Sequence, residues 1–234
     1  MTAKKAELAP AERLLRYDWQ KLEEALDLDG CAKLERLLAP GECTELAGLY
    51  DRQELFRSRV VMARHGYGRG EYQYFEYPLP ALVGSLREAF YPRLAPVANR
   101  WNESLGVDGR FPAEHREFLE SCHAAGQLRP TPLLLRYGES DYNCLHQDLY
   151  GDLVFPLQVV VLLSAPERDF TGGEFVLTEQ RPRMQSKPLV VPLQQGDALV
   201  FAVNQRPVRG ARGVYRVKMR HGVSRLRSGH RHTL

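Results

Sequence analysis

The sequence predicts a mainly β protein, a sandwich or barrel of short strands with helices packed against it. From Thr131 onward, short runs rich in Val, Leu, Phe and Tyr alternate with clusters of Gly, Pro, Asp or Ser, a spacing that is typical of sandwiches and barrels. Before Thr131 most segments have helical patterns instead. We therefore expect residues 1–130 to form a helical segment with one β-hairpin, packed as one structural unit on a core of residues 131–234.

Helical patterns dominate the first 130 residues. One helix is expected over residues 8–30, because Pro10 suits its first turn, apolar residues recur at helical spacing and Gly30 suits its end. Two β-prone stretches in 57–77, joined by a turn with glycines at 66–70, predict a hairpin. The same signals predict a strand at 31–38 and helices at 39–51, 81–106 and 112–126, the 81–106 helix being bent at Pro92 and Pro96.

The β-rich part contains short runs of β-branched, aromatic and leucine residues bounded by turn residues. Such runs are the usual sequence signal of strands. The strands expected from them are 131–137, 152–164, 173–179, 188–193, 197–203, 214–223 and 230–234.

The composition is that of a soluble globular chain. Hydrophobic residues make up 44% of the 234 positions, and the net charge of +3 is too small to imply a nucleic-acid or membrane partner. No apolar run approaches the roughly 18 residues that span a bilayer, and four cysteines without a C-x-x-C pair suggest reduced thiols. We therefore expect a cytoplasmic protein. Basic residues do crowd one stretch that lacks acidic residues, namely Arg206, Arg209, Arg212, Arg216, Lys218, Arg220, Arg225, Arg227 and Arg231.

A histidine and an aspartate lie two residues apart in the stretch NCLHQDLYGD, at His146 and Asp148. In a strand, side chains at this spacing share a face, about 6–7 Å apart. The pair can therefore bind one metal ion from one side. A surface turn without chemistry is the competing interpretation, since H-x-D arises by chance in many proteins.

A third ligand is required for a metal site, and His221 is the best candidate because it falls on a late expected strand. His65 lies in the hairpin turn, and His115 and His123 lie on an expected helix. Two histidines and one carboxylate leave three positions of an octahedral ion open, which suits non-haem Fe(II). A zinc hydrolase competes with this interpretation, although the sequence contains no H-E-x-x-H motif.

The residues after His221 suggest an anion site. If 230–234 is a strand, Arg231 and Thr233 share a face. A planar guanidinium can meet the far carboxylate of a dicarboxylic acid with two charge-assisted hydrogen bonds. The alternative is that Arg231 is one more arginine in a basic tail.

Residues 131–234 resemble the catalytic core of the Fe(II)/2-oxoglutarate-dependent dioxygenases, in particular the prolyl-hydroxylase-like branch. The resemblance rests on the order and spacing of LLLRYGESDYNCLHQD, LQVVVLLS, TGGEF, PLQQGDALVF and HGVSRLRSGHRHT. It implies a double-stranded β-helix, or jelly roll, with helices packed on its outer face. It also implies that Fe(II), 2-oxoglutarate and O₂ are used together and that succinate and CO₂ are released. Whether ascorbate keeps the iron reduced stays open.

Carried over residue by residue, the resemblance makes His146, Asp148 and His221 the iron ligands. Arg231 matches the basic residue that holds the distal carboxylate of 2-oxoglutarate, with Thr233 assisting. Tyr137 matches a tyrosine that lines the co-substrate pocket, and Tyr142 is a weaker candidate. The chain departs from the family in an insertion at 204–220, interpreted as an extra hairpin over the site.

Three functions remain open at this stage. The first is hydroxylation of a C–H bond in a protein, peptide or small molecule, with a protein or peptide favoured. The second is oxidative demethylation of nucleic acid, and the third is a non-catalytic binding module. Two segments, 63–75 and 204–216, have the arginines and tyrosines expected of loops that contact the substrate.

Overall fold

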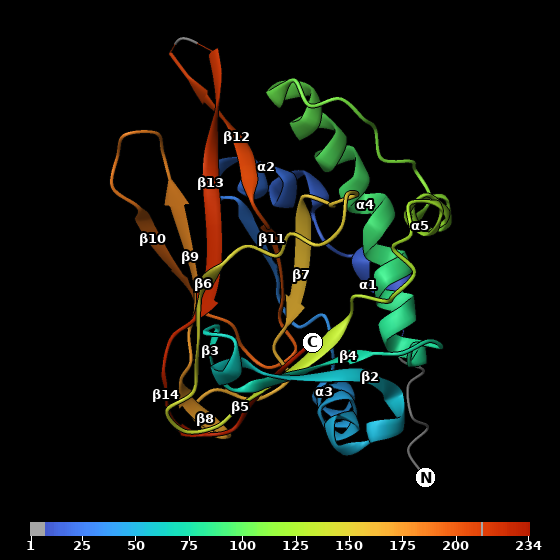
Figure 1. Ribbon diagram of the computed structural model, residues 1–234, viewed down its shortest axis with the longest axis vertical. Coiled ribbons are helices and arrows are strands. Elements are labelled where there is room, and N and C mark those ends of the chain that lie inside the picture. The colour runs from blue at the N-terminus through green and yellow to red at the C-terminus, as the bar shows by residue number, and fades with distance from the viewer. Residues whose placement is uncertain (1–7, 212) are drawn as a thin grey trace.

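The computed structural model describes residues 8–211 and 213–234, and its mainly β architecture confirms the expected fold class (Figure 1). Fifteen strands and five α-helices occur in this described part. The helices are α1 (Pro10–Leu14), α2 (Trp19–Asp29), α3 (Pro40–Gly48), α4 (Ala81–Leu105) and α5 (His115–Ala124). None of these helices combines the length and the apolar composition that crossing a membrane requires.

The single helix expected over residues 8–30 is wrong, because the chain forms α1 and α2 with a break between them. Asp18 causes the second start: its carboxylate accepts a hydrogen bond from the Lys21 backbone N–H at 3.3 Å, which caps α2. Gly30 ends α2 in the left-handed conformation, at φ 74°, as expected. Helix α4 continues through both of its prolines.

The largest sheet has the strand order β10-β9-β13-β6-β3, with β12 also paired to β13. A second sheet has the order β15-β5-β4-β2, a third β1-β11-β7, and β14 pairs with β8. The bounds of the strands in these sheets are β1 Cys31–Leu34, β2 Phe56–Val61, β3 Gly68–Arg69, β4 Glu71–Phe75, β5 Leu133–Tyr137, β6 Tyr142–His146, β7 Leu157–Val161, β8 Phe170–Gly172, β9 Phe175–Gln180, β10 Lys187–Val191, β11 Ala198–Ala202, β12 Gln205–Gly210, β13 Gly213–Val223, β14 Leu226–Gly229 and β15 Arg231–Thr233.

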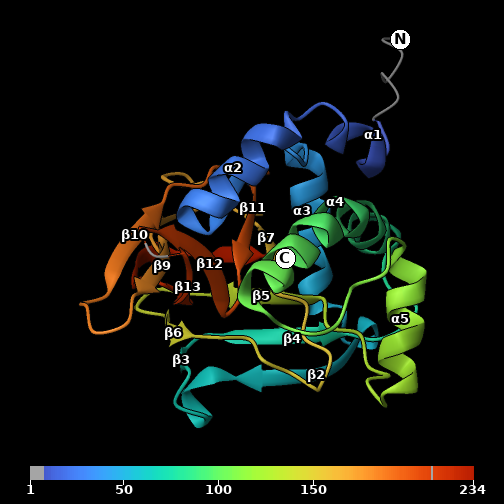
Figure 2. The same ribbon diagram turned by 90° about the horizontal axis from the view of Figure 1, so that it is seen from above.

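Strands from both ends of the chain share these sheets. Strand β1 pairs with β11, β3 pairs with β6, and β4 pairs with β5. Seen from above, β2 and β4 form one side of the molecule, while α2 lies on the opposite side (Figure 2). The predicted boundary at residue 130 marks a change in sequence pattern. The first 130 residues nevertheless supply four strands to the sheets.

Two hydrophobic clusters fill the molecule. The larger joins α4 to the surrounding strands around Trp101, Leu134 and Val217. The smaller lies between the sheets and includes Tyr137, Leu177 and Phe201. This smaller cluster supports the site described next, because Tyr137 and the neighbours of His221 belong to it.

Candidate active site

Strands β6 and β13 bring two histidines together. His146 is the last residue of β6 and pairs directly with His221 on β13. The centroids of the two imidazole rings lie 4.2 Å apart. The rings of Phe175 and Phe201 pack against His221, at centroid distances of 6.0 and 4.7 Å. His221 is therefore held in an apolar wall, with 6% of its surface exposed.

A bulge in β6 turns this strand toward the site. Val223 pairs with Asn143 while His221 pairs with His146, so three steps along β6 match two along β13. Because His221 and Val223 share a face of β13, the bulge brings Asn143 and His146 to that same face. Gly222 makes the close approach possible, since a Cβ atom at this position would lie 2.7 Å from the Asn143 carbonyl oxygen.

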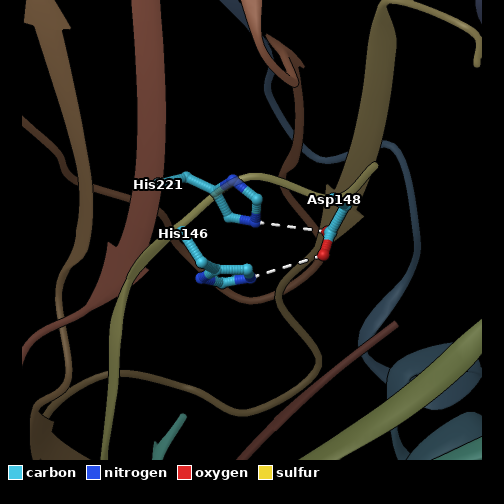
Figure 3. A group of neighbouring side chains, drawn as sticks. All are labelled: His146, Asp148 and His221. Carbon is cyan, nitrogen blue, oxygen red and sulfur yellow. Dashed lines mark ion pairs between the residues drawn. The ribbon is translucent and has the colours of Figure 1, made fainter. Parts of the chain in front are cut away.

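Asp148 reaches the two imidazoles from a loop, so the expectation that His146 and Asp148 share a strand face is wrong. The chain leaves β6 after His146, because the Gln147 amide turns away and donates to the Asn204 side-chain oxygen and to the Met219 carbonyl, at 2.7 and 2.8 Å. The loop then returns the Asp148 carboxylate to the site. Its oxygens lie 3.5 Å from His146 Nε2 and 3.4 Å from His221 Nε2 (Figure 3).

The electrostatics of this group favour a bound cation. Burial alone would raise the pKa of Asp148, but the His221 hydrogen bond and the two imidazoles lower it to about 2. Burial lowers the pKa of His221, which favours its neutral form. The His146 Nδ1 atom lies 2.8 Å from the Cys144 carbonyl oxygen, and as a donor there it leaves Nε2 free as an acceptor.

One ligand atom from each of the three residues can be chosen so that all lie within 4.8 Å of one another. Within the described residues, no other set of three or more His, Cys, Asp or Glu side chains meets this condition. His65 stacks on Tyr67 in the hairpin turn, and His115 packs against Tyr91 on α4. Two imidazoles and one carboxylate around a common point form a facial set that suits Fe(II).

Arg231 lies on β15 directly opposite Tyr137 on β5, and both side chains are almost fully buried. The Nε and Nη1 atoms of Arg231 and the Tyr137 hydroxyl have no hydrogen-bond partner among the described protein atoms. Burial lowers the pKa of Arg231 to about 10, which leaves the guanidinium charged at neutral pH. The buried Arg231 guanidinium has N–H groups without acceptors, and an anion would offset the cost of removing its charge from water. The space beside Arg231 and Tyr137 is therefore suited to a carboxylate.

The comparisons with known proteins agree with this geometry. Residues 70–234 match the family Oxygenase-NA, described as an oxygenase "catalysing oxidative methylation of damaged DNA". The chain belongs to this oxygenase family. The Mycobacterium tuberculosis protein named Uncharacterized protein Rv2227 is 48% identical to this oxygenase over 187 residues, which cover 78% of this chain and 80% of that one.

Solved structures share the fold of the oxygenase at low sequence identity. A 2OG-Fe(II) oxygenase family oxidoreductase from Burkholderia pseudomallei has a TM-score of 0.54 and 17% identity, with 93% of this chain and 89% of that chain covered. A Pseudomonas putida prolyl-4-hydroxylase has a TM-score of 0.51 and 13% identity, with 92% and 95% covered. The double-stranded β-helix implied by the sequence is thus confirmed. The chain therefore belongs to an oxygenase family and has the fold of 2OG-Fe(II) oxygenase family proteins.

The insertion at 204–220 of the oxygenase forms a hairpin, β12–β13, as expected, but not over the triad. The last pair of the hairpin, Gly210 and Gly213, lies at the far end of β13 from His221 (Figure 1), roughly 26 Å away for eight strand residues. Arg206, expected among the exposed contact residues, is instead buried in an ion pair with Glu179. Arg212 lies outside the described residues.

Several residues around the triad have no signal in the sequence. Asn143 and Tyr150 approach it only because of the bulge and the loop after β6. Tyr150 donates a hydrogen bond to Asp148 Oδ1 at 3.3 Å. Its position two residues after a candidate ligand is the one feature that could have drawn attention to it. Tyr142, the weaker candidate, is 38% exposed on β6.

Proposed function

We propose that His146, Asp148 and His221 bind one Fe(II), that Arg231 binds 2-oxoglutarate, and that the enzyme oxidises a methyl group on a base of damaged DNA. The observation that carries the proposal is the pairing of a three-residue ligand set with a buried arginine that lacks partners for two of its donors. When bound, Fe(II) and 2-oxoglutarate supply the oxidising power, with O₂ consumed and succinate and CO₂ formed.

The protein's own contribution is binding and orientation. The charged Asp148 carboxylate offsets the metal's charge, burial favours the neutral form of His221, and the Nε2 atoms of His146 and His221 are the proposed nitrogen ligands. The His146–Cys144 contact fixes the ring that carries one of these donors. The aromatic wall behind His221 excludes water, which strengthens each electrostatic contact in the site.

Arg231 is the proposed anchor of the co-substrate's distal carboxylate, and Thr233 and Tyr137 are its proposed neighbours. Arg231 and Thr233 are 2% and 1% exposed, so both point into the fold from the same face of β15. The Tyr137 hydroxyl is also buried, lies near the Asn143 side chain and makes no hydrogen bond of ordinary length and angle within the described residues. A carboxylate can accept hydrogen bonds from the guanidinium and from these hydroxyls together.

DNA is the proposed substrate because the matched family is described by action on damaged DNA. Oxygen insertion converts an N-methyl group to N-hydroxymethyl, which releases formaldehyde and restores the N–H group. One O₂ and one 2-oxoglutarate are consumed for each succinate, CO₂ and hydroxymethyl group formed. Protein or peptide hydroxylation, which the sequence favours, is supported here only by likeness of fold.

An anaerobic titration with Fe(II) and 2-oxoglutarate tests the metal and co-substrate roles. The wild-type protein should develop the metal-to-ligand absorption band and form succinate when air is admitted. His221→Ala should lose the band and turnover, while the exposed neighbour variant His230→Ala should keep both. Stoichiometric iron binding by His221→Ala would contradict the ligand assignment.

Formaldehyde release from a methylated single-stranded oligonucleotide tests the substrate. Formaldehyde should appear in step with succinate, above the succinate formed without DNA. Succinate without any DNA-dependent formaldehyde would leave the chemistry standing and show that DNA is not the substrate.

A further inference from the structure

Two tyrosines on β4 line the approach to the candidate metal site. Tyr72 and Tyr74 lie two apart, so they share one face of the strand, while Gln73 and Phe75 between and beside them are buried. Tyr72 pairs with Leu135 on β5, and Leu135 pairs with Thr233 on β15. Tyr72 therefore belongs to the same row of side chains as Thr233, two residues along the strands from the Arg231–Tyr137 pair.

Two further tyrosines approach this face from other segments. Tyr150 donates a hydrogen bond to Asp148 and interacts with the Tyr74 hydroxyl. The Tyr67 carbonyl accepts a hydrogen bond from the Cys144 backbone N–H at 2.9 Å, which ties the turn of the first hairpin to the strand that carries His146. Tyr67 and Tyr150 are 49% and 55% exposed, so their rings are open to solvent.

These four tyrosines, two on β4 and two on other segments, form one group near the Asp148 carboxylate. The pKa of Tyr72 is raised to about 12, first by burial and then by the nearby Tyr74, Tyr67 and Asp148. The rings of Tyr72 and Tyr74 meet edge to face, with centroids 5.5 Å apart. We call Tyr67, Tyr72, Tyr74 and Tyr150 the tyrosine cluster.

Arginines surround the tyrosine cluster. The Arg57 guanidinium lies over the Tyr74 ring, 4.4 Å from its centroid, and donates to the Pro130 carbonyl. Arg64 and Arg69 are exposed in the hairpin turn beside Tyr67. Among the described residues, Arg69 forms one ion pair, with Asp141 at the long distance of 3.9 Å. Aromatic faces with flanking guanidinium groups are the combination that binds single-stranded nucleic acid, through base stacking and phosphate contacts.

We propose that the tyrosine cluster binds one unpaired nucleobase by stacking and presents its edge to the metal site. The inference rests on the proposed function and names the residues that select its substrate. A flipped or single-stranded base loses its neighbours in the stack, and aromatic rings replace them. The exposed arginines of the hairpin turn contact the adjoining phosphates.

Affinity for oligonucleotides tests the proposal without any turnover. The full-length protein is titrated into a fluorescently labelled eight-nucleotide oligothymidylate and, separately, into an abasic backbone of the same length, and anisotropy is recorded. The two probes carry the same phosphates, so only ring stacking distinguishes them. Stacking on aromatic side chains predicts roughly fivefold to a hundredfold tighter binding of the probe that has bases. Equal affinities would overturn the proposal.

Variants locate the binding surface. Tyr72→Leu and Tyr74→Leu should each reduce the preference for the base-containing probe severalfold, while Tyr72→Phe and Tyr74→Phe, which keep the ring, should retain it. Tyr215→Leu, on the distant β12–β13 hairpin, serves as the matched control and should bind like wild type. Wild-type binding by both leucine variants, or binding of an unstructured peptide in preference to the oligonucleotide, would overturn the assignment.

If a leucine variant fails to fold, the phenylalanine variants still test the proposal. Each of them should keep the wild-type ratio of affinities for the base-containing and abasic probes. Loss of discrimination in a folded phenylalanine variant would show that ring stacking is not the basis of binding. Failure of the proposed function would appear elsewhere, as absence of the Fe(II)–2-oxoglutarate absorption band. The two failures are therefore distinguishable, since the binding measurement needs neither iron nor co-substrate.

Discussion

At the scale of single residues, Arg231 combines two properties that sequence alone could not join. Its spacing from His221 and its shared face with Thr233 could be predicted, because a strand places alternate residues on one side. Its burial opposite Tyr137 could not, since this depends on the pairing of β15 with β5, nearly a hundred residues apart in the chain. Burial matters because a guanidinium removed from water is stabilised by an anion that accepts its hydrogen bonds.

Replacement of Arg231 by Ala should raise the Michaelis constant for 2-oxoglutarate about a hundredfold, because a charge-assisted contact in a buried pocket is worth about 2–3 kcal/mol. Iron affinity measured without co-substrate should change little. Arg227→Ala is the matched control, since Arg227 is an exposed arginine of the same segment whose side chain is 75% accessible. An unchanged Michaelis constant in Arg231→Ala would show that the anchor lies elsewhere.

Gly222 is the residue that permits the bulge beside the two histidines. A methyl group at this position would meet the Asn143 carbonyl oxygen at 2.7 Å, so Gly222→Ala must push β6 away from β13 and move His146. We expect this variant to lose at least tenfold in Fe(II) affinity, measured by titration. Gly84→Ala provides the contrast: an added Cβ meets nothing within 4 Å there, so that variant should bind iron normally and gain about 0.5–1 kcal/mol of helix stability.

At the scale of elements, the loop after β6 decides the geometry of the proposed ligand set, His146, Asp148 and His221. The sequence indicated that His146 and Asp148 act together, but it placed them on one strand. A strand ending at His146 cannot be recognised from sequence pattern, because the residues that end it are distant: the Gln147 amide bonds to groups beside β12 and on β13. Side-chain identity was therefore predictable, while the path that delivers the carboxylate was not.

Gln127 clamps the same loop from outside. Its side-chain oxygen accepts hydrogen bonds from the Asp152 and Leu153 backbone N–H groups at 3.1 and 2.8 Å, and its amide donates to the Leu153 carbonyl. Gln127→Ala should release the segment that carries Asp148. Hydrogen exchange of backbone amides in 149–153 should become faster, and Fe(II) affinity should fall severalfold.

The control for this clamp is Gln20→Ala, which removes only an exposed contact with Glu24 on α2. It should leave both exchange and iron affinity unchanged. Unaltered exchange in Gln127→Ala would mean that the loop is held by other contacts, and Gln127 would lose its positioning role.

At the scale of the whole molecule, composition and periodicity predicted the class of fold and most of the strands in the last hundred residues. They did not predict β3, β8 or β14. These strands are short or rich in polar residues, and they exist because a neighbouring strand offers backbone partners. Local preference carries little information about such strands.

The basic stretch near the C-terminus shows the same limit of sequence reasoning. Its arginines looked alike in the sequence but have different roles in the structure. Arg231 is buried opposite Tyr137, Arg216 donates to the Leu105 carbonyl at the end of α4, and Arg227 pairs with Glu174 at the surface. A run of like charges therefore could not reveal which members face water.

Arg206 ties together three parts of the fold. It forms an ion pair with Glu179 on β9 and donates to the Asp27 and Leu28 carbonyls, at 2.8 and 2.9 Å, which lie in the last turn of α2. Arg206→Met should cost about 3–5 kcal/mol, because it leaves the Glu179 carboxylate buried with less compensation. Thermal and urea unfolding measure this cost. The same argument predicts that deletion of 206–212 unfolds the protein.

The pH dependence of stability distinguishes an electrostatic role of the Arg206–Glu179 ion pair from a role in packing alone. Burial alone would raise the pKa of Glu179, but Arg181 and Arg206 lower it below its ordinary value. A lowered pKa contributes stability that is present above the unfolded pKa, about 4.3, and that is lost as the pH falls through the folded value. The free energy of unfolding of wild type should therefore exceed that of Glu179→Gln most at pH 6–7, and the difference should shrink steadily below pH 4. A difference that stays constant from pH 7 to pH 3 would show that Glu179 acts through its shape alone.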